Sequence, residues 1–176
     1  MISLKKLIKE FVDVPPPIIQ HAEIFSQDFI DFVKNAENAA KVGYKKGKWY
    51  PHKSYEGGLP TIAWGHKIKS KEELKRVARG ISDKEAEGLL KKDLEIAKAT
   101  VQKYMKGLGV NIPLSKVQTE MLTEFAFNLG GLEKFPKFAK AVLNKDWATA
   151  KKESKRFAAG KELTRRNKLF NDRYFK

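Results

Sequence analysis

Acid–base chemistry on carboxylates is the catalytic option that the side chains of this 176-residue chain favour. The three histidines, His21, His52 and His66, lack the paired spacing that presents two imidazoles on one helix face to a metal. The chain has no cysteine, which excludes thiolate metal ligands, disulfides and a cysteine nucleophile. It also lacks a serine nucleophile elbow and a glycine-rich phosphate loop. We therefore expect no metal and no cofactor, and a reaction that uses aspartate or glutamate.

Glu37 stands where such chemistry needs a proton donor. Hydrolysis of a glycosidic bond with inversion requires a protonated carboxylic acid beside the leaving oxygen and a base that activates water, roughly 6.5 to 9.5 Å away. Glu37 lies at the end of a helix predicted over residues 26–37, shortly before a stretch with β character. A glutamate at a helix end that faces a small sheet is a candidate for the acid.

The elements around Glu37 differ sharply in character. Ser26 is a suitable N-cap for the preceding helix, and Asp28 is favoured in its first turn. In residues 41–68, glycines and prolines separate short aromatic and β-branched pieces. This pattern predicts a small hairpin or a three-stranded sheet.

Helical signals dominate the rest of the chain. Capping boxes begin at Ser70 and Ser82, and the second opens a long helix with one apolar stripe that ends at the glycines of 106–109. A helix starting at Ser115 is apolar on more than one side and is predicted to be the central buried one. Three shorter helices are predicted over 135–144, 146–158 and 163–170.

This order of elements predicts an α+β fold with a small β part segregated from a helical lobe. The length suits one folding unit, which we place in residues 21–176, with the β-rich part over about 41–68 and the helical lobe over about 70–176. Residues 1–20 are predicted to form an amphipathic arm and a proline-rich connector. We expect the arm to dock on its own domain, with contact to a membrane surface as the alternative. The arm is too short and too interrupted for a signal peptide or a transmembrane segment.

Several motifs occur in the order found in one enzyme family. These are Ala36-Glu37-Asn38, Tyr44, Thr61-Ile-Ala-Trp-Gly-His66, Ile81 to Glu87, Phe125 to Gly130, Ala158 to Arg166, and Leu169-Phe170. Over about residues 26–170 the chain resembles phage-type lysozymes and endolysins of glycoside hydrolase family 24. Members of that family read Glu-Gly, a Tyr, and Thr-Ile-Gly-x-Gly-His.

The resemblance implies a lysozyme-like fold, with the cleft between the β element and the helical lobe and a connecting helix that begins near Ser82. It implies hydrolysis, with inversion, of the β-1,4 bond between N-acetylmuramic acid and N-acetylglucosamine in peptidoglycan. Glu37 would be the general acid, with a pKa raised by partial burial. Thr61 would hold the attacking water through its hydroxyl group.

The second carboxylate is where the sequence departs from the family pattern. The family carries an aspartate about six residues before the threonine, whereas no aspartate occurs between Glu37 and Thr61. Glu56 is the nearest acidic residue and our candidate for the base or water-orienting group. His52 is the alternative, because an imidazole can take a proton near neutral pH.

Other family positions are matched or replaced. Phe127 and Asn128 match positions that line the cleft, where an aromatic ring can pack on a sugar and an amide can bond its acetamido group. Arg165 and Arg166 match a basic pair near the cleft. Asn38 replaces the glycine after the catalytic glutamate, and Ala63 replaces the first glycine of Thr-Ile-Gly, which restricts the backbone there.

The net charge of +15 implies an anionic partner. Peptidoglycan is the substrate that we expect, with electrostatic attraction to the anionic cell envelope, no binding of nucleic acid, and a monomeric enzyme. The expected setting is a phage-encoded protein made in the host cytoplasm that acts on the cell wall from the periplasm or from the virion. Two alternatives stay open: a lytic transglycosylase on the same substrate, and a cationic module that binds nucleic acid or membranes without catalysis.

Overall fold

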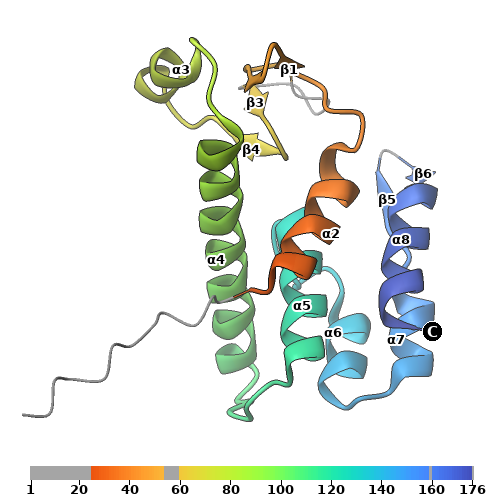
Figure 1. Cartoon of the computed structure of the whole chain (residues 1–176). Helices are drawn as coiled ribbons and strands as arrows, with labels where there is room; N and C mark the ends of the chain where they lie inside the picture. Colours follow the sequence, from red (N-terminus) through yellow and green to blue (C-terminus); the bar gives the residue numbers. More distant parts are fainter. Residues whose placement is uncertain (1–24, 54–59, 159, 176) are drawn as a thin grey trace, which may run out of the picture.

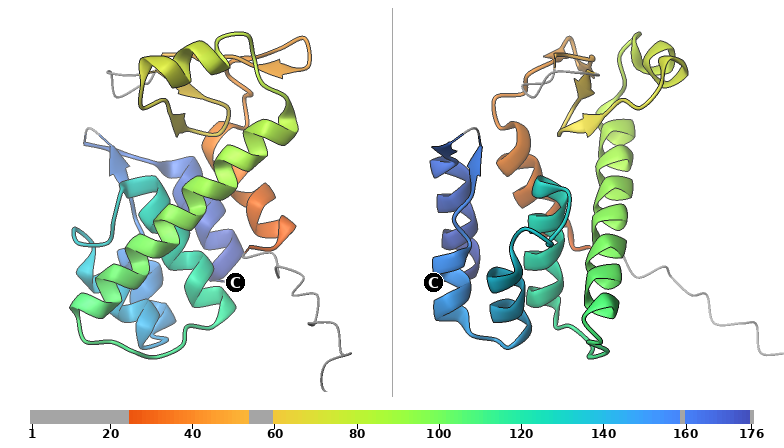
Figure 2. Two further views of the ribbon diagram at one scale, coloured as in Figure 1. Left: turned by 90° about the vertical axis from the view of Figure 1, so that its left-hand side faces the viewer. Right: turned by 180° about the vertical axis from the view of Figure 1, so that it is seen from behind.

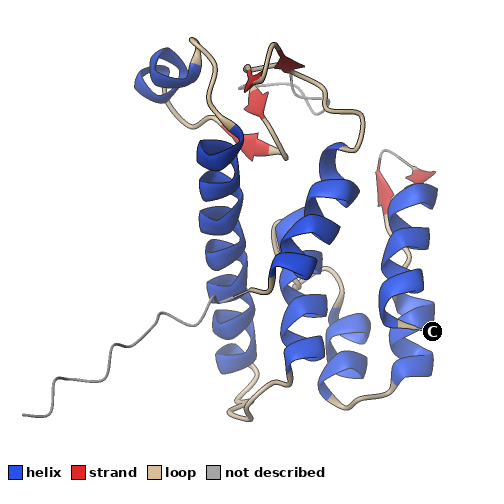
Figure 3. Ribbon diagram, viewed as in Figure 1, coloured by secondary structure: helices blue, strands red, loops and turns tan. Residues whose placement is uncertain are grey.

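Two unequal lobes joined by one long helix make up the protein (Figure 1). The computed structural model describes residues 25–53, 60–158 and 160–175. The predicted arm and connector and Glu56 therefore lie outside the described residues. The described part is mixed α+β, as predicted, with short two-residue strands and a larger helical portion (Figure 3).

The first described helix carries the site's candidate acid. Helix α2 (Gln27–Asn38) begins at the predicted N-cap, because the Ser26 hydroxyl accepts from the backbone N–H of Phe29. Its buried side chains recur at helical spacing, which presses one face of the helix against the body of the protein. At its start, Asp28 accepts a hydrogen bond of 2.7 Å from Arg173, near the end of the chain.

Two hairpins form the core of the small lobe. Strand β1 (Tyr44–Lys45) pairs with β2 (Lys48–Trp49), and β3 (Thr61–Ile62) pairs with β4 (His66–Lys67), each antiparallel. A backbone bridge between His52 and Thr61 links the two hairpins. The predicted β element is thus present as two small hairpins. Helix α3 (Lys71–Val77) lies beside them in Figure 1.

Helix α4 (Asp83–Gly107) connects the lobes. The predicted capping box is formed: the Ser82 hydroxyl accepts from the Glu85 N–H, and the Glu85 carboxylate accepts from the Ser82 N–H. The buried stripe of α4 serves both lobes, since Leu90 and Leu94 pack with the small lobe and Val101 and Met105 pack with the helical lobe. Figure 2 shows the helix running the length of the molecule.

The helical lobe follows in four helices and a third hairpin. Their bounds are α5 (Lys116–Leu129), α6 (Pro136–Leu143), α7 (Trp147–Glu153), β5 (Phe157–Ala158), β6 (Lys161–Glu162) and α8 (Thr164–Tyr174). Helix α5 ends where predicted, because Gly130 takes the left-handed conformation that closes a helix. The prediction of a helix over 146–158 is wrong beyond Glu153, since Phe157 and Ala158 form a strand.

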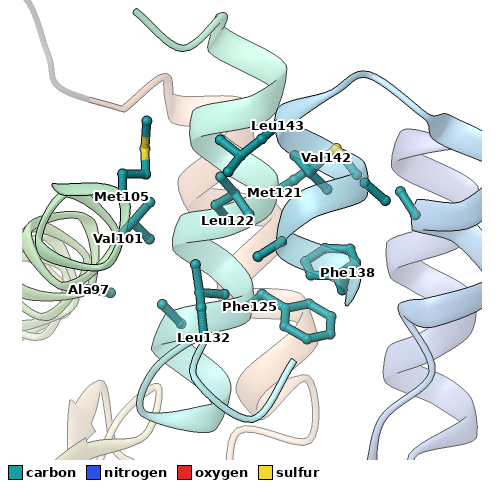
Figure 4. Packing of buried hydrophobic residues seen from close by; sticks show 14 of the residues in the cluster. Ala97, Val101, Met105, Met121, Leu122, Phe125, Leu132, Phe138, Val142 and Leu143 are labelled. Carbon is teal, nitrogen blue, oxygen red and sulfur yellow. The ribbon is translucent and has the colours of Figure 1, made fainter. Parts of the chain in front are cut away.

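Two buried hydrophobic clusters form the cores of the two lobes. The larger cluster joins α4, α5, α6, α7 and α8, and it includes a stack of Phe125 on Phe138 with ring centroids 3.9 Å apart (Figure 4). The smaller cluster joins α2, both N-terminal hairpins, α3 and the first half of α4. Phe32 and Phe127 pack against both clusters. No helix among the described residues is long and apolar enough to cross a bilayer.

Candidate active site

A cleft of about 880 Å³ lies where the small lobe meets the helical lobe. One wall comes from the end of α2 and the N-terminal hairpins, and the other from α4, the end of α5 and the start of α8. Five of the six residues predicted to form the site lie on or in its walls: Glu37, His52, Thr61, Phe127 and Asn128. The sixth, Glu56, lies outside the described residues.

The Glu37 carboxylate is largely withdrawn from water. It sits in the last turn of α2 with a side chain that is 16% exposed, and it forms an ion pair with Arg166 of α8. Burial raises the pKa of Glu37 above its ordinary value, and the positive charge of Arg166 opposes that rise. The net direction is upward, which is what a carboxyl group needs in order to carry a proton near neutral pH.

A glycine gives the Glu37 carboxylate room on its hairpin side. A Cβ built on Gly65 would lie 3.6 Å from Oε2 of Glu37, so the β3–β4 turn approaches the carboxylate closely. Gly65 has φ +85°, which favours glycine over other residues. Gly65, the glycine of the Thr61–His66 motif, therefore allows the turn to form and leaves room for the Glu37 carboxylate.

A second ion pair lies deeper behind Arg166. The Arg156 guanidinium is fully buried, and its Nη1 donates to both carboxylate oxygens of Glu124 at 2.8 and 2.9 Å. Its Cζ lies 4.8 Å from the ring centroid of Phe125 and equally far from that of Phe170. Burial lowers the pKa of Arg156, and Glu124 counters that effect. Each of the two arginines is thus paired with one glutamate, and the pair of Arg156 with Glu124 is the more deeply buried.

The hairpin part of the same wall brings Thr61 and His52 together. The Thr61 Oγ1 lies 3.4 Å from the His52 Nδ1, and the two backbones exchange hydrogen bonds of 2.8 and 2.9 Å. The other ring nitrogen of His52, Nε2, is buried without a hydrogen-bond partner among the described atoms. Gly43 lies against the ring, because a Cβ there would come 2.8 Å from His52 Cδ2. The imidazole therefore has a fixed place next to the threonine hydroxyl.

Asn38, which stands where the family has glycine, joins the end of α2 to the hairpin part of the same wall. Its Nδ2 donates to the carbonyl of Ala63 at 2.8 Å and to that of Val42 at 3.0 Å. Its Oδ1 accepts from the Val42 N–H at 2.9 Å. The other replacement, Ala63, takes φ +53°, a strained conformation for a residue with a side chain. The asparagine thus fastens the end of α2 to the turn that carries the strained alanine.

The remaining predicted residues lie on the helical wall. Phe127 and Asn128 are half-buried in the last turn of α5, and Oδ1 of Asn128 lies 3.4 Å from Nη1 of Arg156. The basic pair divides: Arg166 binds Glu37, whereas Arg165 lines the cleft and donates to Asn35 at 2.7 Å.

Sequence reasoning missed a cluster where strand β4 meets α3 and α4. His66 Nδ1 lies 2.7 Å from an oxygen of Asp93 on α4, and His66 Nε2 lies 3.2 Å from Glu73 on α3. The hydrogen bond with Asp93 is the largest cause of a raised pKa for His66. His66 belongs to a motif, but its partners come from two other helices, so no local pattern could have paired them.

The geometry supports proton transfer within the cleft. A buried carboxyl with a raised pKa faces the cleft from the end of α2, and a hydroxyl beside an imidazole faces it from the N-terminal hairpins. Among the described residues, no three or more His, Asp or Glu side chains gather in a way that would hold a metal ion.

Known structures and one family model resemble this chain. The muramidase domain of SpmX from Asticaccaulis excentricus matches with a TM-score of 0.56 and 18% identity, covering 86% of this chain and 97% of that one. An endolysin from the Escherichia coli O157:H7 phage FAHEc1 matches with a TM-score of 0.59 and 19% identity, covering 86% and 93%. A variant of P22 lysozyme matches with a TM-score of 0.56 and 20% identity, covering 83% and 97%.

These structural matches establish a lysozyme-like fold. No curated protein sequence is significantly similar to the chain. The family model for phage lysozyme matches residues 25–172, which is most of the chain and includes every described element that forms the cleft. The chain therefore belongs to the phage lysozyme family of glycoside hydrolases, the muramidases.

Proposed function

We propose that the protein hydrolyses the β-1,4 bond between N-acetylmuramic acid and N-acetylglucosamine in peptidoglycan, with inversion and with Glu37 as general acid. The observation that carries the proposal is the state of the Glu37 carboxyl, which is buried at the cleft with a pKa raised by desolvation. A protonated carboxyl there can deliver its proton to the leaving oxygen. Phe127 and Asn128 bind sugar rings on the adjacent wall.

Thr61 holds the attacking water, and a second group accepts its proton. The contact of 3.4 Å between Thr61 Oγ1 and His52 Nδ1 supports His52 in that position. His52 can accept a proton in the neutral form without a further negative charge in the cleft. Glu56 remains the competing candidate, because it is the one acidic residue in the sequence between Glu37 and Thr61.

The test is the release of reducing ends and the mass of the products from purified peptidoglycan. Wild type should release hydrated sugar ends, and Glu37→Gln should lower the rate by a factor of ~10³ or more, because the proton donor is lost. His52→Ala and Glu56→Gln, compared side by side, identify the second group by whichever loses ~10²-fold or more. Val42→Ala, a cleft-wall change without a reacting group, is the control.

Other products would contradict parts of the proposal. Anhydro sugar ends would mean that a sugar hydroxyl attacks in place of water, as in a lytic transglycosylase. Retained activity in Glu37→Gln would remove the assigned acid. No cleavage by a well-folded wild type would leave the cationic binding module as the explanation of the charge.

The net charge of +15 supports accumulation of the enzyme on the anionic cell envelope before it acts as a monomer on the wall. This attraction between charges at the surface weakens with ionic strength. Binding of the inactive Glu37→Gln variant to purified walls should therefore fall as salt rises. Binding that does not depend on salt would contradict the electrostatic part of the proposal. We place this activity in the periplasm or at the virion of a phage that encodes the protein.

A further inference from the structure

The end of the helical lobe farthest from the small lobe exposes apolar side chains that the proposed catalysis does not use. Two connections meet at that end, the one between α4 and α5 and the one between α6 and α7, in every view of Figures 1 and 2. Seven large apolar residues are prominently exposed in the described part of the chain, and four belong here. They are Leu108 (55% exposed), Ile112 (53%), Val117 (46%) and Trp147 (39%). We call this surface the distal face.

The distal face contains a groove that is lined by two of these side chains, Val117 and Trp147. The groove, of about 620 Å³, runs between the start of α5, the start of α7 and the end of α8. Val117, Trp147 and Phe175 supply its apolar walls, and Lys145 and Lys151 stand on its rim. Neither lysine forms an ion pair with any residue that the structure describes.

The charge of the distal face is one-sided. Residues 103–118 and 144–152, which build it, contain six lysines and one acidic residue, Asp146. Asp146 is engaged as the N-cap of α7, where its side chain accepts from the Thr149 N–H at 3.0 Å. A surface with many lysines and exposed apolar side chains complements a partner whose outer layer is anionic and whose next layer is apolar.

We propose that the distal face docks on a bilayer that contains anionic phospholipid. Lysines contact the headgroups, and leucine, isoleucine and valine side chains enter the acyl boundary. An indole is suited to that interface because it has an apolar body and one N–H donor. Anionic polymers of the cell wall satisfy the charge but offer no apolar layer to bury the four exposed side chains. The cleft shares no lining residue with the groove and stays open to substrate during docking.

Tryptophan fluorescence reports this docking directly. Trp49 and Trp64 are buried in the small lobe, at 0% and 9% exposed, so Trp147 is the indole whose surroundings change on lipid binding. The full chain is mixed with vesicles of equal parts phosphatidylglycerol and phosphatidylcholine, and with vesicles of phosphatidylcholine alone. We expect co-sedimentation and a blue shift of the emission with the anionic vesicles only. Trp147→Phe should bind within about twofold of wild type but lose the shift.

Matched variants separate the distal face from general cationic attraction. Lys145→Gln with Lys151→Gln should lower the partition coefficient about tenfold. Lys71→Gln with Lys75→Gln removes the same charge from α3 in the other lobe and should stay within about twofold. Trp147→Ser should also lower binding about tenfold, while Phe157→Ser, which removes an aromatic side chain that is 56% exposed elsewhere, should not.

Four results would overturn the proposal. The first is an equal loss of binding in both lysine pairs, which would reduce the effect to net charge. The second is binding of the wild type to anionic vesicles without a blue shift. The third is loss of binding in the full chain carrying Leu7→Asp while the distal-face variants bind normally, which would assign lipid contact to the N-terminal arm. The fourth is concentration-dependent self-association of wild type without lipid that Trp147→Ser removes. Hydrolysis of purified peptidoglycan, measured in parallel, should be unchanged in every distal-face variant.

Discussion

The side-chain amide of Asn38 donates to the backbone carbonyl of Ala63 at 2.8 Å and so ties the helix of the candidate acid to the turn between β3 and β4. That turn holds Gly65 in front of Glu37 and leads back along β3 to Thr61. The position of the Glu37 carboxyl relative to the Thr61 hydroxyl therefore depends on one asparagine that the family pattern does not contain.

Asn38→Ala should lower the free energy of unfolding by about 1–3 kcal/mol, because the carbonyls of Val42 and Ala63 lose a donor at the same time. The rate of peptidoglycan hydrolysis should fall about tenfold through loosened alignment of the site. Urea unfolding and a turnover assay measure the two effects. Asn144→Ala, at an exposed helix end, is the control and should change stability by less than about 0.5 kcal/mol.

If Glu37 is the general acid, its ion pair with Arg166 should set the pH range of the enzyme. The pKa of the Glu37 carboxyl is raised by burial and held back by the Arg166 charge. Arg166→Met should raise this pKa further, so the basic limb of the kcat/KM profile should move to higher pH by about one unit or more. Arg165→Met removes an equal charge that is bound to Asn35 and should leave the limb in place. A limb that moves to lower pH would contradict Glu37 as the general acid.

His66 makes stability depend on pH. Its pKa is raised, first by the hydrogen bond with Asp93, above the value of 6.5 that it has when unfolded. Protons are therefore held more tightly by the folded chain, and the stabilisation is complete below pH 6.5 and declines as pH rises through the folded pKa. Asp93→Asn should remove about 2 kcal/mol at low pH and flatten the slope.

The measurement for His66 is the free energy of unfolding by urea across that pH range in wild type and Asp93→Asn. Burial of Glu37 contributes a slope of the same sign, because its pKa is also raised, so the difference between the two proteins isolates His66. Asp172→Asn removes an exposed carboxylate paired with Lys168 and should leave the curve unchanged. An identical slope in Asp93→Asn would refute the assignment.

Removing one partner of the buried pair of Arg156 and Glu124 should destabilise the protein strongly, whereas replacing both partners should destabilise it less than the two single changes added together. Arg156→Met and Glu124→Leu should each lower the free energy of unfolding by about 3–5 kcal/mol, since each leaves a buried charge without its partner. The double variant should lose less than the sum of the two. A double-mutant cycle in urea measures the coupling, and additive losses would count against a desolvated pair.

Helix starts were predictable because they depend on local chemistry. Ser26, Ser82 and Ser115 each cap a helix at the residue where the sequence places it. The third hairpin was not predicted, although Gly160, at φ +77°, is a typical turn residue. The prediction of one helix over 146–158 misses the end of α7 at Glu153, beyond which the buried Arg156 pairs with Glu124 on α5, a contact distant in sequence.

The sequence could predict those residues of the candidate site that belong to family motifs. Glu37, Thr61, Phe127 and Asn128 stand in family patterns, and all four line the cleft. The pairing of Thr61 with His52 depends on how two hairpins meet, which no local spacing encodes. The partners of Arg156 and His66 depend likewise on contacts between helices that are distant in sequence.

The ion pair of Glu37 with Arg166 joins α2 to α8, and the contact of Asp28 with Arg173 joins the same two helices. Synthesis runs from the N-terminus, so the acid leaves the ribosome long before the arginine that holds it. A nascent chain that has emerged only through α7 contains both N-terminal hairpins but neither Arg166 nor Arg173. The ion pair of Glu37 with Arg166 therefore forms only after α8 is released, and truncated products of interrupted translation carry the candidate acid without this partner.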